Sequence, residues 1–165
     1  ILLTREKDVY LDKYQRLEKV LELKPQLLIS VHADAFFTRD ASGFGALYLK
    51  DGEGSIQSRD ILNNYSAKPS DSMRLASKGF AQHILNDLHN HYHLHNRLPT
   101  PEALVILRSP WSESVLLELG FLSNPVEAKK LANTEYITQL VNDVVNSIEG
   151  YVLKKYGIIK IGAVD

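Results

Sequence analysis

Short apolar runs alternate along this 165-residue chain with longer segments whose apolar residues recur at helical spacing. The clearest short runs are residues 27–31 and 115–119, and each has the length and composition of a strand buried on both faces. The clearest helical segments run over residues 71–92 and 136–152. Strands that alternate with helices are typical of α/β domains. We therefore predict an α/β fold with a mostly parallel central sheet flanked by helices on both faces.

Three residues mark the start of a further helix. Asn124 suits the N-cap, Pro125 suits the first helical position, and Glu127 can reach back to the cap as in a capping box. Weaker patterns complete the prediction: a helix over residues 10–21, strands over 43–49 and 103–107, a helix over 125–132, and an edge strand or linker over 157–165.

Composition limits what this chain can bind. The formal net charge is −1, and the lysines and arginines form no basic stripe interleaved with aromatic residues, so we predict no nucleic-acid partner. No apolar run approaches the roughly 20 residues of a transmembrane helix, so we predict no membrane span. The absence of cysteine excludes disulfides, thiolate metal sites and cysteine nucleophiles.

His32 follows a predicted buried strand directly, with Asp34 two residues further on. Open α/β sheets bind ligands at the carboxyl ends of their strands, so His32 is a candidate metal ligand. Asp34 could support it as a neighbouring carboxylate or line the substrate cleft. A structural role is the alternative for both residues, because a histidine at a strand end is more often structural than a ligand.

Glu118 places a carboxylate inside an otherwise apolar run. Burying a carboxylate costs several kcal/mol unless it is paired, hydrogen-bonded or close to a metal. Burial would also raise its pKa, which suits a general base. The alternative is that Glu118 lies at an exposed strand end and pairs with Arg108 or Arg5.

Two segments of the sequence resemble a known family. LISVHADA at residues 28–35 and SVLLELGFLSNP at residues 114–125 closely resemble motifs of the zinc-dependent N-acetylmuramoyl-L-alanine amidases, amidase type 3. LTREKD at residues 3–8 resembles the threonine-arginine-x-x-aspartate turn of that family, and Arg16 stands where an arginine precedes the histidine strand. The resemblance covers nearly the whole chain.

The resemblance implies a zinc ion bound by two histidines and a glutamate. His32 matches the second histidine, and Glu118 matches the glutamate that takes a proton from the attacking water and passes it to the leaving amine. The other two ligands of the family precede its threonine-arginine turn, so we expect them upstream of Ile1. Residues 1–156 would then be a catalytic domain that lacks its N-terminal strand and helix.

The implied reaction is hydrolysis of the amide bond between N-acetylmuramic acid and L-alanine in peptidoglycan. The implied location is periplasmic or extracellular, with peptidoglycan as the binding partner and an activator protein as a possible second one. A catalytically inactive module that binds peptidoglycan and has lost its zinc is the alternative, because His32 is the only family ligand that the sequence supplies.

Two further features are weighed separately. Trp111 could stack on a sugar or peptide at the rim of the cleft, or could equally be a packing anchor. His89, His91, His93 and His95 alternate at spacings that could hold a metal on a helix, but the surrounding residues favour a fraying helix end.

Overall fold

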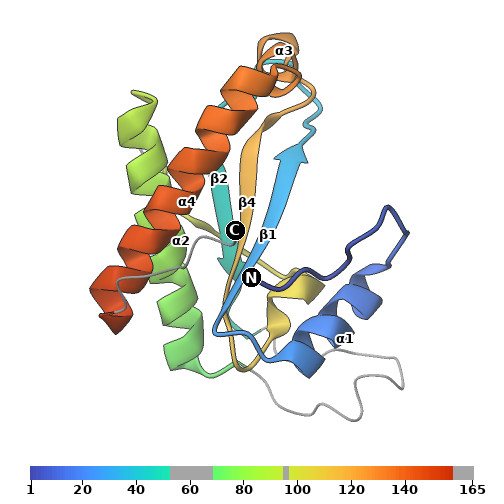
Figure 1. Ribbon diagram of the computed structural model, residues 1–165, viewed down its shortest axis with the longest axis vertical. Helices are drawn as coiled ribbons and strands as arrows, with labels where there is room; N and C mark the ends of the chain where they lie inside the picture. The colour runs from blue at the N-terminus through green and yellow to red at the C-terminus, as the bar shows by residue number, and fades with distance from the viewer. Residues whose placement is uncertain (53–68, 95–96, 158–165) are drawn as a thin grey trace, which may run out of the picture.

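The computed structural model describes residues 1–52, 69–94 and 97–157 (Figure 1). In chain order the described elements are α1 (Lys13–Leu23), β1 (Leu27–Asp34), β2 (Gly45–Leu49), α2 (Asp71–His91), β3 (Thr100–Glu102), the 3-10 helix η1 (Val105–Arg108), β4 (Glu113–Phe121), α3 (Pro125–Leu131) and α4 (Thr134–Tyr156). No helix within these residues has the length and apolar character needed to cross a bilayer.

The sheet has the strand order β1-β4-β2-β3. β1 pairs with β4 in parallel, β2 pairs with β3 in parallel, and β2 pairs with β4 in antiparallel orientation. The sheet is therefore mixed, with parallel pairings in the majority among the described strands. This confirms the predicted α/β class.

Helices cover both faces of the sheet, but unequally. On one face α2 and α4 lie side by side, and Val115 and Leu117 of β4 pack there against Phe80 of α2 and Leu140 of α4 (Figure 1). Side chains alternate along a strand, so Leu116 faces the opposite side, where it packs against Leu107 of η1. Burial of each such side chain contributes about 1.5–3 kcal/mol.

The first helix covers the second face only through η1. Leu17 and Leu21 of α1 form a small cluster with Val105 of η1, so α1 packs on η1 and extends that layer. Asp12 caps α1 by accepting hydrogen bonds from the backbone of Tyr14 and Gln15. The helix ends at Lys24, which has a left-handed φ of 47°.

Two predicted elements need correction. The strand predicted over residues 103–107 is wrong, because β3 ends at Glu102 and the apolar run forms the turn of η1. A single 3-10 turn buries Leu107 fully and still satisfies its N–H, which donates to the Leu104 carbonyl at 3.2 Å. β1 is half-exposed rather than buried, because it pairs only with β4 among the described strands. The prediction for residues 157–165 falls almost entirely outside the described residues.

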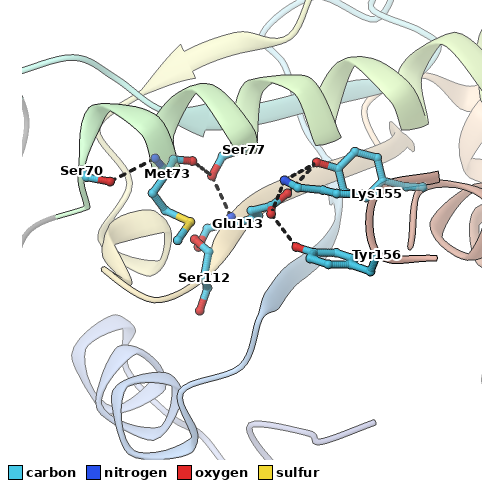
Figure 2. A network of polar contacts seen from close by, with 9 residues as sticks. Ser70, Met73, Ser77, Ser112, Glu113, Lys155 and Tyr156 are labelled. Atoms are coloured by element: carbon cyan, nitrogen blue, oxygen red, sulfur yellow. Dashed lines mark hydrogen bonds and ion pairs between the residues drawn. The ribbon is translucent and has the colours of Figure 1, made fainter. Parts of the chain in front are cut away.

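A buried carboxylate anchors the start of β4 to α4. Glu113 accepts hydrogen bonds from the hydroxyls of Tyr151 at 2.6 Å and Tyr156 at 2.7 Å, and forms an ion pair with Lys155 (Figure 2). Burial alone would raise the pKa of Glu113, but these three donors outweigh burial and lower the pKa. The neighbouring Ser114 N–H donates to the Ser77 hydroxyl of α2 at 2.9 Å, so both helices hold this end of the strand.

Candidate functional site

The pairing of β1 with β4 brings His32 and Glu118 together. The two residues are direct partners in the parallel register, so their backbones lie about 4.8 Å apart and their side chains share a face of the sheet. That face is the one to which Leu116 points, opposite the layer formed by α2 and α4. Two residues from distant parts of the sequence therefore lie side by side near the carboxyl ends of neighbouring strands.

The Glu118 carboxyl group has a buried oxygen without a hydrogen-bond partner. Oε2 accepts no hydrogen bond from the part of the chain that the structure describes. Burial and then the nearby charge of Asp34 raise the pKa of Glu118 to about 7. Arg5 forms its ion pair with Asp8, with 3.7 Å between the charged atoms, so the geometry does not favour the alternative pairing of Glu118 with Arg5.

Gly45 leaves room beside this carboxyl group. It is the partner of Glu118 in the antiparallel pairing of β2 with β4. A Cβ atom at position 45 would lie 3.5 Å from the Glu118 Cβ and 3.9 Å from its Cγ. A larger side chain on the same face would compete with the Glu118 side chain for space.

The His32 ring is exposed, and its Nε2 lies 2.9 Å from the Ser30 hydroxyl oxygen. Partial burial, followed by the charge of Arg16, lowers the pKa of His32, while Asp34 acts in the opposite direction. The net effect is a lowered pKa, which favours the neutral form of the imidazole. The neutral form is the one that binds metal ions.

Asp34 lies at an irregularity in the strand pairing. The register shifts between His32 and Asp34, so Asp34 is opposite Phe121. Its carboxylate accepts a hydrogen bond from the Ala35 N–H at 2.7 Å, and its carbonyl accepts one from the Leu122 N–H at 2.6 Å. Because its charge affects the pKa of both His32 and Glu118, Asp34 belongs to the electrostatic environment of the site.

Trp111 does not join these residues. It precedes the start of β4, whereas Glu118 lies near the strand's end, so strand rise alone separates them by roughly 20 Å. The Lys24 ammonium group lies over the Trp111 ring, with its Nζ atom 5.0 Å from the ring centroid. This contact is at the end of the sheet opposite to Glu118. This position favours the alternative of an anchor between loops.

Two aromatic residues that the sequence analysis did not single out follow the histidine strand. Phe36 and Phe37 are separated from Asp34 only by Ala35, and the two residues are 56% and 101% exposed. Their rings form an edge-to-face pair with centroids 6.1 Å apart. The available signal was a pair of aromatic residues in the polar segment immediately after the histidine strand.

The predicted capping box at α3 is half correct. Asn124 caps the helix by accepting from the N–H groups of Val126 and Glu127. The Glu127 carboxylate, however, does not reach back to Asn124. It accepts hydrogen bonds from Phe121 and Gly43, and so connects the ends of two strands.

His32 and Glu118 together fit part of a catalytic zinc site. A catalytic zinc is held by three protein ligands and keeps an open position for water. The described residues contain no group of three or more potential ligands. His32 would supply one imidazole to such a site, and its register partner Glu118 has a buried carboxyl oxygen that accepts no hydrogen bond from a described residue.

An α/β domain with an imidazole and a carboxyl group near the carboxyl edge of its sheet has side chains suited to hydrolysis. Comparison with known protein families identifies the family to which this chain belongs. A family model described as N-acetylmuramoyl-L-alanine amidase, Amidase_3, matches residues 1–150. The chain therefore belongs to the Amidase_3 family of N-acetylmuramoyl-L-alanine amidases, which are enzymes.

Curated relatives agree with this assignment. A putative N-acetylmuramoyl-L-alanine amidase of Buchnera aphidicola is 28% identical over 96% of this chain and 78% of its own length. The amidase AmiA of Salmonella typhimurium is 28% identical over 90% of this chain, and AmiC of Neisseria meningitidis is 26% identical over 92% of it. The chain spans only 60% and 42% of the lengths of these last two.

Solved structures share the fold. The catalytic domain of the amidase CwlV from Bacillus (Paenibacillus) polymyxa aligns with a TM-score of 0.69 at 22% identity, over 92% of this chain and 71% of that one. The amidase CwlD from Clostridioides difficile, solved in complex with the GerS lipoprotein, aligns with a TM-score of 0.72 at 23% identity, over 93% and 76%.

Proposed function

We propose that this protein hydrolyses the amide bond between N-acetylmuramic acid and L-alanine in peptidoglycan. The family assignment supports this reaction. The observation that carries the proposal is the pairing of His32 with Glu118 on one face of the sheet, where one Glu118 oxygen is buried and unpartnered among the described residues.

Glu118 is proposed as the general base and then the general acid. A carboxyl group that titrates near pH 7 can accept the proton of the attacking water as the water oxygen bonds to the amide carbonyl carbon. The same proton then passes to the nitrogen as the carbon–nitrogen bond breaks. The products are the muramoyl carboxylic acid and the free amine of L-alanine.

His32 is proposed as a zinc ligand, with the Ser30 hydroxyl holding the orientation of its ring. The remaining histidine and glutamate ligands are proposed to come from outside residues 1–165, with residues 1–156 forming the rest of the catalytic domain. A bound zinc ion would supply a water of lowered pKa and polarise the substrate carbonyl.

The substrate is proposed to lie across the face where Asp34 and the Phe36–Phe37 pair border the site. Exposed aromatic rings offer apolar faces to sugar rings or to the alanine side chain. Peptidoglycan lies outside the inner membrane, so we place the protein in the periplasm or outside the cell. The complex of CwlD with the GerS lipoprotein is a precedent for a protein partner, and we propose that such a partner would act here as an activator.

An inactive module that binds peptidoglycan is the second candidate function. The observation that favours it is the lack of a three-ligand group among the described residues. Zinc content distinguishes the two candidates, because only the enzyme needs the ion.

The test uses the full-length protein and purified sacculi. The Glu118→Gln variant is expected to abolish release of peptides with a new L-alanine amino group, while its zinc content stays at the wild-type level. Glu135→Gln, an exposed glutamate in the first turn of α4, is the matched control and should keep full activity. Full turnover by Glu118→Gln would refute the assigned role, and a wild-type protein with neither zinc nor turnover would favour the binding module.

A further inference from the structure

We infer that Glu127 is a positioning residue for the reaction, because its carboxylate holds β2 and β4 together at the point where Glu118 projects from the sheet. The inference rests on the proposed function, since it assigns Glu127 to the reaction of Glu118. Glu127 acts through the two strands and need not touch the substrate.

We call the Glu127 carboxylate and its two backbone donors, Gly43 and Phe121, the Glu127 clamp. The clamp begins where the pairing of β2 with β4 ends. The antiparallel pairing of β2 with β4 reaches the pair Gly45–Glu118 and stops there. Beyond that pair, the Gly43 N–H donates to Glu127 Oε1 at 2.6 Å and the Phe121 N–H donates to Oε2 at 2.8 Å. The two oxygens of one carboxylate therefore replace the backbone pairing just past Glu118, through hydrogen bonds that its charge strengthens.

Local structure fixes Glu127 in this position. Asn124 caps the first turn of α3, and its side-chain amide also donates to the Ala41 carbonyl at 3.2 Å. Gly120 has a φ of +130°, and a Cβ there would lie 3.5 Å from Glu127 Oε2 and 3.3 Å from Leu131 Cδ1. Glycine at this position permits both the backbone conformation and the close approach of the carboxylate.

The clamp lies close enough to Glu118 to control its position. Phe121 is three residues beyond Glu118 on the same strand, and Gly43 is two residues before Gly45, the partner of Glu118. The same strand end also holds β1, because the Leu122 N–H donates to the Asp34 carbonyl. Without the clamp the strand ends can separate, which moves the Glu118 carboxyl group and lets water reach it.

The test compares Glu127→Ala and Glu127→Gln with wild type in the full-length protein, on a soluble muramoyl peptide. Glu127→Ala is expected to lower kcat about 10–100-fold while KM changes by less than about twofold, because misplacement of a catalytic group acts on the chemical step. Glu127→Gln keeps one acceptor oxygen, so its kcat should lie between those of wild type and Glu127→Ala. The kcat of Glu135→Gln should match that of wild type.

One measurement decides the inference without turnover. Exchange of the Gly43 and Phe121 amide hydrogens should be slow in wild type and faster in Glu127→Gln. A folded Glu127→Ala variant with wild-type kcat would overturn the inference. If the wild type proves inactive, or if Glu127→Ala does not fold, unchanged exchange of these two amide hydrogens in Glu127→Gln would overturn it.

Discussion

At the scale of single residues, Glu118 has an environment that opposes its charge. It has lost water on one oxygen without gaining a hydrogen bond there from any described residue, and the nearest influential charge is the like charge of Asp34. Such an arrangement costs stability when the group is ionised. A carboxyl group held in this way is poised to bind a proton near neutral pH, which is the property that the proposed reaction requires.

The cost should be measurable as a pH-dependent stability. The folded-state pKa of Glu118 is raised to about 7, so folding takes up a proton between about pH 4.5 and 7. The contribution of Glu118 to stability is therefore complete below that window and is lost as the pH rises through it. Glu118→Gln should raise the free energy of unfolding by about 1–3 kcal/mol at pH 8 relative to its effect at pH 4. Urea denaturation at both values checks this, and an equal effect at pH 4 and pH 8 would contradict it.

Phe37 offers a second residue-scale prediction. Its side chain is fully exposed, so Phe37→Ala should leave stability within about 0.5 kcal/mol of wild type. If the ring contacts the substrate, the variant should raise KM about 3–10-fold with kcat unchanged, since one lost apolar contact is worth about 1 kcal/mol. Val145→Ala, on the face of α4 away from the site, is the control. An unchanged KM would remove Phe37 from the substrate contacts.

At the scale of elements, β4 is held firmly at both ends by side chains of helices. The Glu113 carboxylate at the start of the strand accepts hydrogen bonds from α4 (Figure 2). The Glu127 carboxylate of α3 accepts a hydrogen bond from the N–H of Phe121 at the end of the strand. Between these two anchors the strand buries Val115 and Leu117 against α2 and α4. The position of Glu118 along the strand is therefore fixed from two directions.

The anchor at the start of β4 predicts loss of stability in acid. The pKa of Glu113 is lowered, so its contribution is present above the unfolded-state pKa near 4.5 and is lost as the pH falls through the folded-state pKa. Glu113→Gln should lower the free energy of unfolding by about 2–3 kcal/mol at pH 7, and by much less at pH 3. Urea denaturation checks this, with Glu149→Gln on the exposed side of α4 as control. An equal loss at both pH values would contradict the assignment.

The elements that the sequence predicts well are those whose own residues decide the structure. The helical period from Asp71 onward, with Ser70 as cap, is sufficient to specify α2, and the apolar run around Val115 specifies β4. Residues 103–107 form an equally apolar run, but contacts with Leu49 and Leu116 decide that it turns. The hydrogen bonds of Glu127 are also decided by distant contacts. A local capping rule cannot predict that its carboxylate accepts from two backbone N–H groups of other segments.

The candidate site, like the fold, was predictable only where a residue's own segment decides its position. The pairing of His32 with Glu118 agrees with two motifs whose strands could be recognised separately, and a parallel sheet brings their ends together. Ser30, Gly45 and the Phe36–Phe37 pair could not be assigned in this way, because their proximity depends on register and on the path of a loop. For Trp111 the sequence left a stacking role and a packing role equally open, because its distance from Glu118 depends on how far the strand extends between them.

At the scale of the whole molecule, the proposed zinc site depends on metal ligands that other parts of the protein would supply. Among the described residues, the proposed ligand His32 has Glu118 as its register partner but belongs to no group of three potential metal ligands. A single imidazole cannot define a tetrahedral zinc site. Measuring the zinc content therefore tests whether other parts of the protein supply the remaining ligands.

We predict that residues 1–165 alone retain far less than one zinc ion per chain after dialysis, whereas the full-length protein retains about one. His32→Ala in the full-length protein should lower zinc affinity at least about 10–100-fold, the range seen even for residues that only support a ligand. Glu118→Gln should leave zinc content unchanged, because Glu118 is assigned to the water and not to the metal. Metal analysis by mass spectrometry checks all three, and a full zinc complement in residues 1–165 would mean that the ligands lie within this chain and that the proposed set is incorrect.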